Sequence, residues 1–232
     1  HGVRVKGVEL DLKAMLARKD KVVKGSNDGV LYLFRKNKVT FLHGRGSFGK
    51  GPGEVVVNGE THTAKNVIIA TGSNPRALPG AAFDEQRILS NTGALAIPEV
   101  PKRLGVIGAG VIGLEMGSVW RRLGAEVTVL EALPNFLGAA DDAVAKEAQK
   151  AFAKQGLAIH TGVKITAVKS GKAEVTVEWT DDKGAAQVLE CDRRVVSVGR
   201  VPHTDGLGLE SIGLSVDERG FIPVDDHCRT AV

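Results

Sequence analysis

The sequence predicts an α/β fold in which one complete βαβ unit interrupts a second, incomplete α/β unit, and each unit has a small β-meander. A buried strand, a glycine turn and a helix follow one another over residues 104–123, and another strand comes next. A hairpin followed by an apolar strand that ends in glycine occurs twice, at 54–72 and 174–199. Only the second copy is preceded by a glycine turn, so we expect the chain to begin inside the incomplete unit.

The glycine turn has the spacing Gly108-x-Gly110-x-x-Gly113, directly after the apolar strand 104–107. The next predicted strand closes on Glu131, 23 residues after Gly108. Glycines at this spacing, between a strand and a helix and followed by an acid, are typical of a Rossmann-like dinucleotide site. The alternative is a glycine-rich turn that binds no ligand. The position of Glu131 at the expected distance after the turn argues against it.

Each glycine has a separate role in such a site. We expect Gly108 to make the tight turn, Gly110 to let the backbone approach a pyrophosphate, and Gly113 to let helix and strand pack closely. The free N–H groups and partial positive charge of the helix N-terminus would hold the phosphates. The residues expected to line this part of the site are Gly108, Ala109, Gly110, Val111, Ile112, Gly113, Leu114 and Glu115.

Glu131 predicts which dinucleotide binds. Its carboxylate should accept the adenosine-ribose hydroxyls and repel a 2′-phosphate, and no Arg follows in 132–134. We therefore expect NAD rather than NADP. An ordinary acid at the end of a strand is the alternative.

Apolar spacing and turn residues predict the elements of the incomplete unit. Residues 10–34 have helical spacing, which predicts one long helix or two helices broken near Gly25 and Gly29. Further expectations in chain order are a short buried strand at 39–42, a turn at 44–48, a hairpin of 54–57 and 60–63 through Asn58-Gly59, and a buried strand at 67–70.

The complete βαβ unit begins near Pro98, after a linker rich in proline and glycine. After the glycine-turn helix we expect, in chain order, a strand at 126–131, a helix capped by Asp141 or Asp142 and ended by Gly156, a strand at 157–160, meander strands at 174–179 and 186–190, and a buried strand at 194–198. The predicted domains are 1–73, 74–203 and 204–232, the first and last being parts of one interrupted domain.

Composition excludes several function classes. A hydrophobic fraction of 43% with 25% charged residues is ordinary for a globular protein, and no apolar run reaches ~18 residues. The net charge of +4 comes from basic residues scattered among acids, and one Tyr and two Trp give little material for base stacking. We therefore expect neither nucleic-acid binding nor a membrane span. Residues 1–5 have no apolar signal core and no initiator Met, so we expect a longer parent chain.

The cysteines and histidines do not form a chemical motif. Cys191 and Cys228 fit neither a zinc pattern nor a short redox loop, and the six histidines are dispersed. We expect two free thiols in a reducing compartment and no metal site.

These motifs together resemble the flavoprotein disulfide reductases, and among them the members that oxidise dihydrolipoamide. The resemblance extends over essentially the whole chain, with one small departure at Val201, where the family often has a second Arg. The runs that carry it are 69–73, 105–115, 117–120, 123–131, 199–200, 204–207 and 217–221.

The resemblance implies an NAD-binding domain inserted in an incomplete FAD-binding domain, with NAD and FAD as cofactors. It implies oxidation of lipoyl groups carried by the acyltransferase of 2-oxo-acid dehydrogenase complexes, and a homodimer. The family's redox cysteine pair and its flavin-side lysine would precede His1, and its His–Glu base would follow Val232. We therefore expect no catalytic residue here. The compartment would be the bacterial cytoplasm or the mitochondrial matrix.

The resemblance also assigns further site residues. It places Glu115 beside the nicotinamide and flavin rings, and Ile165 and Gly199 along the NAD site. On the FAD side it assigns Gly46, Thr71, Gly72 and Ser73. The alternatives are that Glu115 is a solvated helix acid, that Ile165 and Gly199 only pack in the strands, and that the FAD-side residues are simple turn residues.

The sequence is also compatible with other functions. Another reductase of the family, of the mercuric or soluble transhydrogenase type, would differ outside this sequence. A catalytically inert NAD-binding module is a second alternative. A single-domain dehydrogenase is a weaker one, because no catalytic His, Tyr-x-x-x-Lys or substrate domain follows Gly199.

Overall fold

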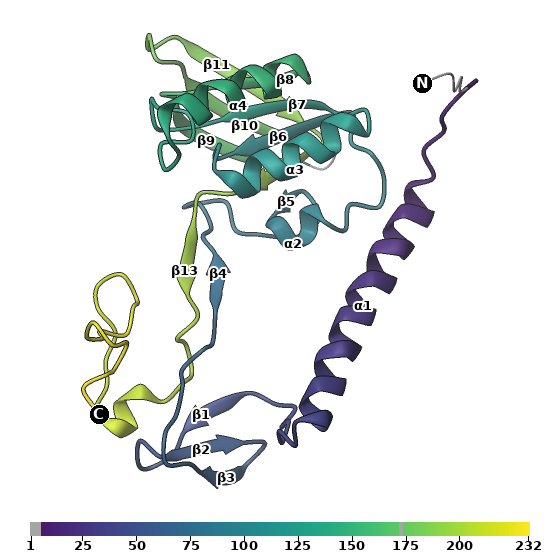
Figure 1. The fold of residues 1–232 in the computed structure, drawn as a ribbon. Helices are drawn as coiled ribbons and strands as arrows, with labels where there is room; N and C mark the ends of the chain where they lie inside the picture. The colour runs from purple at the N-terminus through teal and green to yellow at the C-terminus, as the bar shows by residue number, and fades with distance from the viewer. Residues whose placement is uncertain (1–5, 172–173) are drawn as a thin grey trace. The chain divides into compact units, whose positions relative to one another are not determined.

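A computed structural model describes residues 6–171 and 174–232 (Figure 1). The chain divides into two compact units, one of His1–Asp20 with Pro75–Gly199 and the other of Lys21–Asn74 with Arg200–Val232. The second unit is thus made of two stretches separated in sequence by most of the first. The first five residues, on which the expectation about a signal core rests, lie outside the described part of the chain.

A five-stranded parallel sheet is the centre of the first unit. Its strands run in the order β5-β12-β6-β7-β8, and every neighbouring pair is parallel. The bounds are β5 (Ile88–Leu89), β12 (Arg193–Val196), β6 (Arg103–Ile107), β7 (Glu126–Leu130) and β8 (Leu157–His160). The strands expected at 104–107, 126–131, 157–160 and 194–198 are confirmed, with Glu131 and the last two residues of the fourth just beyond the strand ends. The two residues of β5 are too few to give a periodic signal.

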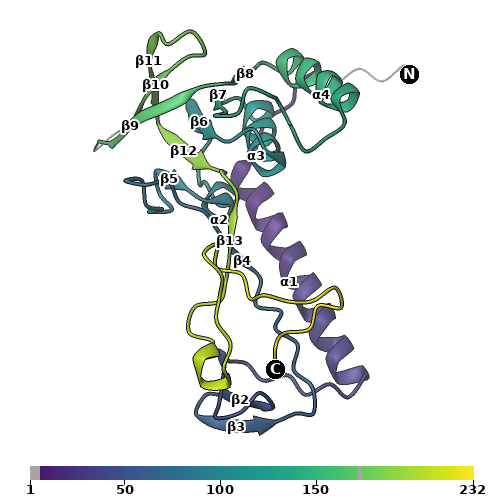
Figure 2. The same ribbon diagram turned by 90° about the vertical axis from the view of Figure 1, so that its left-hand side faces the viewer.

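Helices cover one face of this sheet (Figure 2). They are α2 (Asn91–Ala94), α3 (Val111–Arg122) and α4 (Asp142–Lys154). Asp141, not Asp142, is the cap of α4, because its Oδ1 accepts the N–H of Ala143 at 2.9 Å. Leu114 and Trp120 of α3 and Ala145 of α4 are buried and pack with Val106 and Val127 of the sheet.

An antiparallel meander covers the opposite face. It consists of β9 (Lys164–Ser170), β10 (Val175–Thr180) and β11 (Ala186–Cys191), in the order β11-β10-β9. Val177 and Trp179 of β10 pack against Ile107 and Leu130 at the carboxyl ends of β6 and β7. The sequence does not predict β9, because a shift in the β9–β10 register at Glu178/Trp179 interrupts the regular alternation of its side chains.

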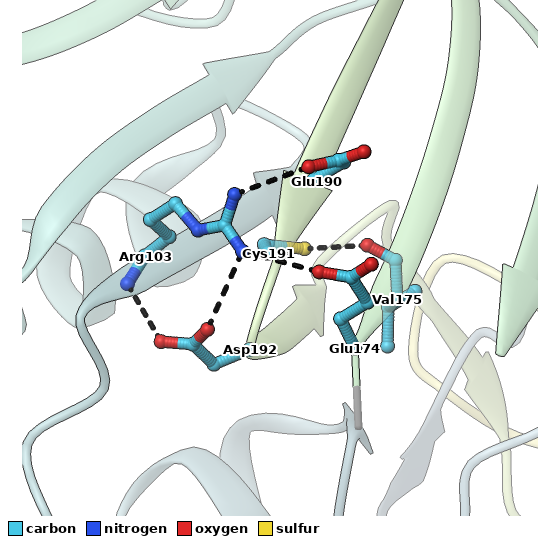
Figure 3. A network of polar contacts seen from close by, with 6 residues as sticks. All are labelled: Arg103, Glu174, Val175, Glu190, Cys191 and Asp192. Atoms are coloured by element: carbon cyan, nitrogen blue, oxygen red, sulfur yellow. Dashed lines mark hydrogen bonds and ion pairs between the residues drawn. The ribbon is translucent and has the colours of Figure 1, made fainter. Parts of the chain in front are cut away.

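A charged cluster ties the meander to the start of β6 (Figure 3). The Arg103 guanidinium lies 3.2 Å from Glu174 and 3.4 Å from Glu190, and its backbone N–H donates to Asp192 at 2.9 Å. These groups are partly exposed, so each ion pair contributes little to stability by itself. Between them the Cys191 thiol points inward and donates to the Val175 carbonyl at 3.5 Å.

Cys191 is expected to make the first unit less stable at alkaline pH. Burial raises the pKa of this thiol to about 11 from 9.0. Above pH 9 the unfolded chain releases this proton and the folded chain keeps it. The contribution of the protonated thiol to the free energy of unfolding is therefore fully present below pH 9 and is lost as the pH rises to 11. We expect the loss to reach roughly 2–3 kcal/mol.

The measurement is urea unfolding of wild type and Cys191→Ala at pH 8, 9, 10 and 11. Groups that titrate equally in both proteins cancel in the difference. Parallel pH curves for the two proteins would contradict the assignment.

The second unit contains a smaller antiparallel meander. It consists of β1 (Gly46–Phe48), β2 (Glu54–Val57) and β3 (Glu60–Thr63), in that order. The expected hairpin is confirmed, and both turn residues have the positive φ of a type I′ turn, 53° at Asn58 and 85° at Gly59. The short strands β4 (Ser73–Pro75) and β13 (Arg200–Pro202) pair with each other, and a 3₁₀ turn, η1 (Leu209–Ile212), packs near Phe48.

Three expectations for the second unit are wrong. Residues 39–42 form no strand, and the exposed Phe41 stacks on Phe34 and His43 instead. Residues 67–70 also form no strand, and Ile68 is 89% exposed. No described strand pairs with either segment, so their apolar runs lack the hydrogen bonds of a sheet. Residues 46–48, expected in a turn, form β1 because they pair with 55–57.

The predicted N-terminal helix is one unbroken element, α1 (Leu12–Lys36). Gly25 and Gly29 lie inside it without ending it, because an isolated glycine costs a helix only about 1 kcal/mol. None of its side chains is fully buried. Among the described residues, no helix has the length and apolar character needed to cross a membrane.

Candidate functional site

Two of the three glycines of the turn are required by the protein itself. Gly108 has φ +100°, and a Cβ there would lie 2.2 Å from the Ser197 carbonyl oxygen. A Cβ on Gly113 would lie 2.1 Å from the Gly108 carbonyl oxygen. Both distances are far inside van der Waals contact with backbone atoms, so these glycines let the turn, α3 and the end of β12 pack closely.

Gly110 differs from the other two. Its φ of −74° and ψ of 174° suit any residue, and a Cβ there would meet nothing within 4 Å. The fold therefore does not explain this glycine. Gly110 is also the N-cap of α3 and supplies no side chain to cap the free N–H groups. This position is open for an anionic ligand that approaches the backbone.

The start of α3 has one open side and one packed side. Val111 is 68% exposed, whereas Leu114 is 2% exposed and belongs to the core. Ile112 is half-buried and Glu115 is exposed. Leu114 therefore fixes the helix, and Val111 lies at the surface where a ligand would pass.

Glu131 is held against the glycine turn by backbone donors. Its Oε2 accepts the N–H of Ala109 at 2.7 Å, and its Oε1 accepts the N–H of Leu133 at 2.8 Å. A carboxylate has about four acceptor positions, so both oxygens can accept further hydrogen bonds. The carboxylate is thus fixed beside the turn, in a position to accept two hydroxyls of a ribose.

The structure brings Gly199 close to the turn but gives no such contact for Ile165. Gly199 has φ +107° and follows Ser197 and Val198, whose backbone adjoins Gly108. Ile165 lies in β9, half-buried in the cluster that contains Leu130. Its role as a ligand contact stays a prediction.

The four residues expected to touch FAD belong to the other unit. The Thr71 hydroxyl donates to the His203 carbonyl at 2.6 Å, and Gly72 has φ +76°. Ser73 accepts from the Arg200 guanidinium at 2.7 Å, and Gly46 lies half-buried in β1. Thr71 and Gly72, but not the other two, line a pocket of about 870 Å³ within this unit.

The N–H of Leu133 is a partner of Glu131 that the sequence does not predict. A backbone donor has no side-chain signature, so only the fold could reveal it. His160 ends the strand expected at 157–160, and its carbonyl accepts the N–H of Glu131 at 2.8 Å.

Comparison with known proteins gives a consistent result. Residues 4–232 match the family described as pyridine nucleotide-disulphide oxidoreductase. The chain is 60% identical over its whole length to a dihydrolipoyl dehydrogenase of Cupriavidus necator, covering 50% of that protein. It is 48% identical over its whole length to a mitochondrial dihydrolipoyl dehydrogenase of Dictyostelium discoideum, covering 49% of it. The chain therefore spans about half the length of these relatives.

Solved structures agree with the sequence relatives. LpdA from Mycobacterium tuberculosis superposes with a TM-score of 0.85 at 28% identity, over 97% of this chain and 50% of LpdA. The HOCl-induced flavoprotein disulfide reductase RclA from Escherichia coli superposes with a TM-score of 0.80 at 25% identity, over 93% of this chain and 49% of RclA. The α/β fold with its parallel sheet and antiparallel meanders is that of these reductases, and the chain belongs to the pyridine nucleotide-disulphide oxidoreductase family.

Proposed function

We propose that the unit of residues 75–199 binds NAD across the carboxyl ends of β6 and β7. The observation that carries this proposal is the Glu131 carboxylate fixed on the Ala109 N–H beside an open Gly110. The pyrophosphate would lie on the N-terminus of α3, and the adenosine ribose on Glu131. Ile165 and Gly199 would complete the site. Bound NAD would supply the hydride acceptor.

Replacement of Glu131 by Gln tests the ribose contact. We expect NADH affinity to fall about tenfold, because a charge-assisted hydrogen bond to the ribose is lost and one backbone donor loses its acceptor. We also expect the preference for NADH over NADPH to shrink, because the charge that repels a 2′-phosphate is gone. Titration followed by NADH fluorescence measures both effects.

Glu126→Gln is the matched control, because Glu126 is an exposed acid at the opposite end of the same strand. It should bind both nucleotides as wild type does. Tighter binding of NADPH than NADH by the unmodified chain would refute the NAD assignment.

On the FAD side, we propose that residues 1–73 and 204–232 are parts of one FAD-binding domain and 74–203 the NAD-binding domain. Gly46, Thr71, Gly72 and Ser73 would form part of the FAD cradle, since glycine and small hydroxyls suit close approach of a dinucleotide. The pocket that Thr71 and Gly72 line supports this. The visible spectrum of the whole subunit tests it, because a bound flavin gives a yellow protein.

For the whole protein we propose NAD-linked, FAD-dependent oxidation of protein-bound dihydrolipoyl groups. The support is the identity to proteins named dihydrolipoyl dehydrogenase in bacteria and mitochondria. The partner would be the lipoyl-bearing acyltransferase of 2-oxo-acid dehydrogenase complexes, and the enzyme would be a homodimer. Its compartment would be the cytoplasm in a bacterium or the mitochondrial matrix in a eukaryote. In this chain Glu115 would lie beside the nicotinamide.

A second candidate is reduction of a different disulfide substrate, favoured by the structural similarity to RclA. An assay of the full-length subunit with dihydrolipoamide and NAD separates the two. Turnover supports the first candidate, and its absence in a yellow, NAD-binding subunit supports the second.

A further inference from the structure

We propose that the imidazole ring of His160 stacks on the adenine ring of the bound dinucleotide. This inference rests on the nucleotide site proposed above and adds a binding residue to it. It concerns the carboxyl end of β8, the strand next to the one that presents Glu131.

The order of the strands gives the direction of the ligand. The glycine turn for the pyrophosphate follows β6, and Glu131 for the adenosine ribose follows β7. The sheet order continues from β6 through β7 to β8. Adenine is attached to that ribose on the side away from the pyrophosphate. The base therefore extends toward the end of β8, where His160 is the last residue.

The backbone fixes His160 relative to Glu131. His160 is in register with Leu130, and its carbonyl accepts the N–H of Glu131 at 2.8 Å. The loop that follows β8 is bonded to the same segment, since Val163 donates to the Glu131 carbonyl at 3.0 Å and Gly162 donates to Leu133 at 2.9 Å. Placement of the ribose on Glu131 would thus place the base close to this loop.

The imidazole ring is supported from the protein side and open to solvent. Its centroid lies 5.0 Å from that of Trp179, and the ring planes are inclined by 50°. Trp179 is only 7% exposed and packs with Leu130, whereas His160 is exposed. The buried indole therefore restrains a planar ring that keeps surface free for a ligand.

Ile165 connects this ring to the rest of the predicted site. It is the register partner of Trp179 across β9 and β10. His160 and Ile165 therefore lie around the same indole, one at the end of the parallel sheet and one on the meander. The family resemblance assigned Ile165 to the NAD site, and the position of His160 follows from the structure alone.

The test compares His160→Ala with His160→Phe, using NADH, ADP-ribose and nicotinamide mononucleotide as probes. Stacking of a base on a ring contributes enough that its removal weakens binding about tenfold. We expect His160→Ala to lose this factor for NADH and ADP-ribose but not for nicotinamide mononucleotide, which has no adenine. His160→Phe, which keeps a planar ring, should stay within about threefold of wild type.

A spectroscopic signal gives a second readout. The chain has two tryptophans, so Trp120→Phe leaves Trp179 as the sole indole. Its fluorescence should change when ADP-ribose binds and should respond less in the His160→Ala background. A purely structural role for His160 would not produce this response.

The outcomes separate this inference from the proposed function. If His160→Ala binds NADH and ADP-ribose as wild type does, the stacking proposal fails and the NAD site stands. Equal losses in His160→Ala and His160→Phe would also overturn stacking. If the unmodified chain binds neither NADH nor ADP-ribose, the proposed function fails and this inference fails with it.

Discussion

Replacement of Gly113 by Ala is expected to destabilise the unit of residues 75–199 by about 3 kcal/mol, at the upper end of the usual cost of overpacking. The new Cβ would lie 2.1 Å from the Gly108 carbonyl oxygen and 3.2 Å from a methyl of Val106. A flexible side chain could move aside, but the first contact is with backbone. Either α3 must shift away from β6 or the glycine turn must deform.

The measurement is urea unfolding followed by tryptophan fluorescence, which reports on this unit because Trp120 and Trp179 both lie in it. Gly110→Ala is the matched control, since its Cβ would meet nothing within 4 Å and its φ is −74°. We expect this control to unfold like wild type but to bind NADH at least about tenfold more weakly, because the Cβ would displace the pyrophosphate.

The two glycine variants therefore separate folding from binding. If Gly110→Ala retained full NADH affinity, the pyrophosphate would not lie on this turn. If Gly113→Ala were as stable as wild type, the close packing of α3 on the turn would be wrong.

Replacement of Arg194 by Met is expected to raise the free energy of unfolding of the same unit by about 2 kcal/mol. Arg194 is fully buried in β12, between β5 and β6. Its Nε, Nη1 and Nη2 have no hydrogen-bond partner in the described part of the chain. Burial also lowers the pKa of this guanidinium, against smaller opposing effects of Cys191 and Asp84, as expected when water is removed from a charge.

Methionine would fill a similar volume without the cost of a buried charge. Arg193→Met is the matched control, because the adjacent guanidinium lies 3.5 Å from the exposed Glu99 carboxylate and donates to the Gln86 carbonyl. Loss of this ion pair and hydrogen bond should lower stability by about 1–2 kcal/mol. A loss of stability in Arg194→Met larger than that of the control would show that this guanidinium has a stabilising partner.

Much of the first unit could be predicted because its signals are local. The strand before Gly108, the helix after it and the stops at Gly124 and Gly156 depend on neighbouring residues, and the structure confirms these elements. The hairpin through Asn58-Gly59 is equally local, because its turn needs two residues that tolerate positive φ.

The errors arose where an element depends on a distant partner. Residues 39–42 and 67–70 have the apolar composition of buried strands, but a strand also needs a neighbour for its backbone hydrogen bonds, and no described strand provides one. Residues 46–48 show the converse. Their sequence is typical of a turn, but they form a strand because they pair with 55–57. The irregular β9 was missed for a related reason, since its register is set by β10.

The sequence by itself determined the α/β class, the glycine turn and the acid that follows it, because these depend on local spacing. The motif predicted different roles for Gly113 and Gly110, and the tertiary structure supplied the atoms behind them: a Cβ at Gly113 would meet the Gly108 carbonyl oxygen, whereas a Cβ at Gly110 would meet nothing within 4 Å. Tertiary packing also joined Glu131 to Ala109, placed His160 on Trp179 and enclosed Arg194. These contacts join residues that only folding brings together, so spacing along the chain could not reveal them.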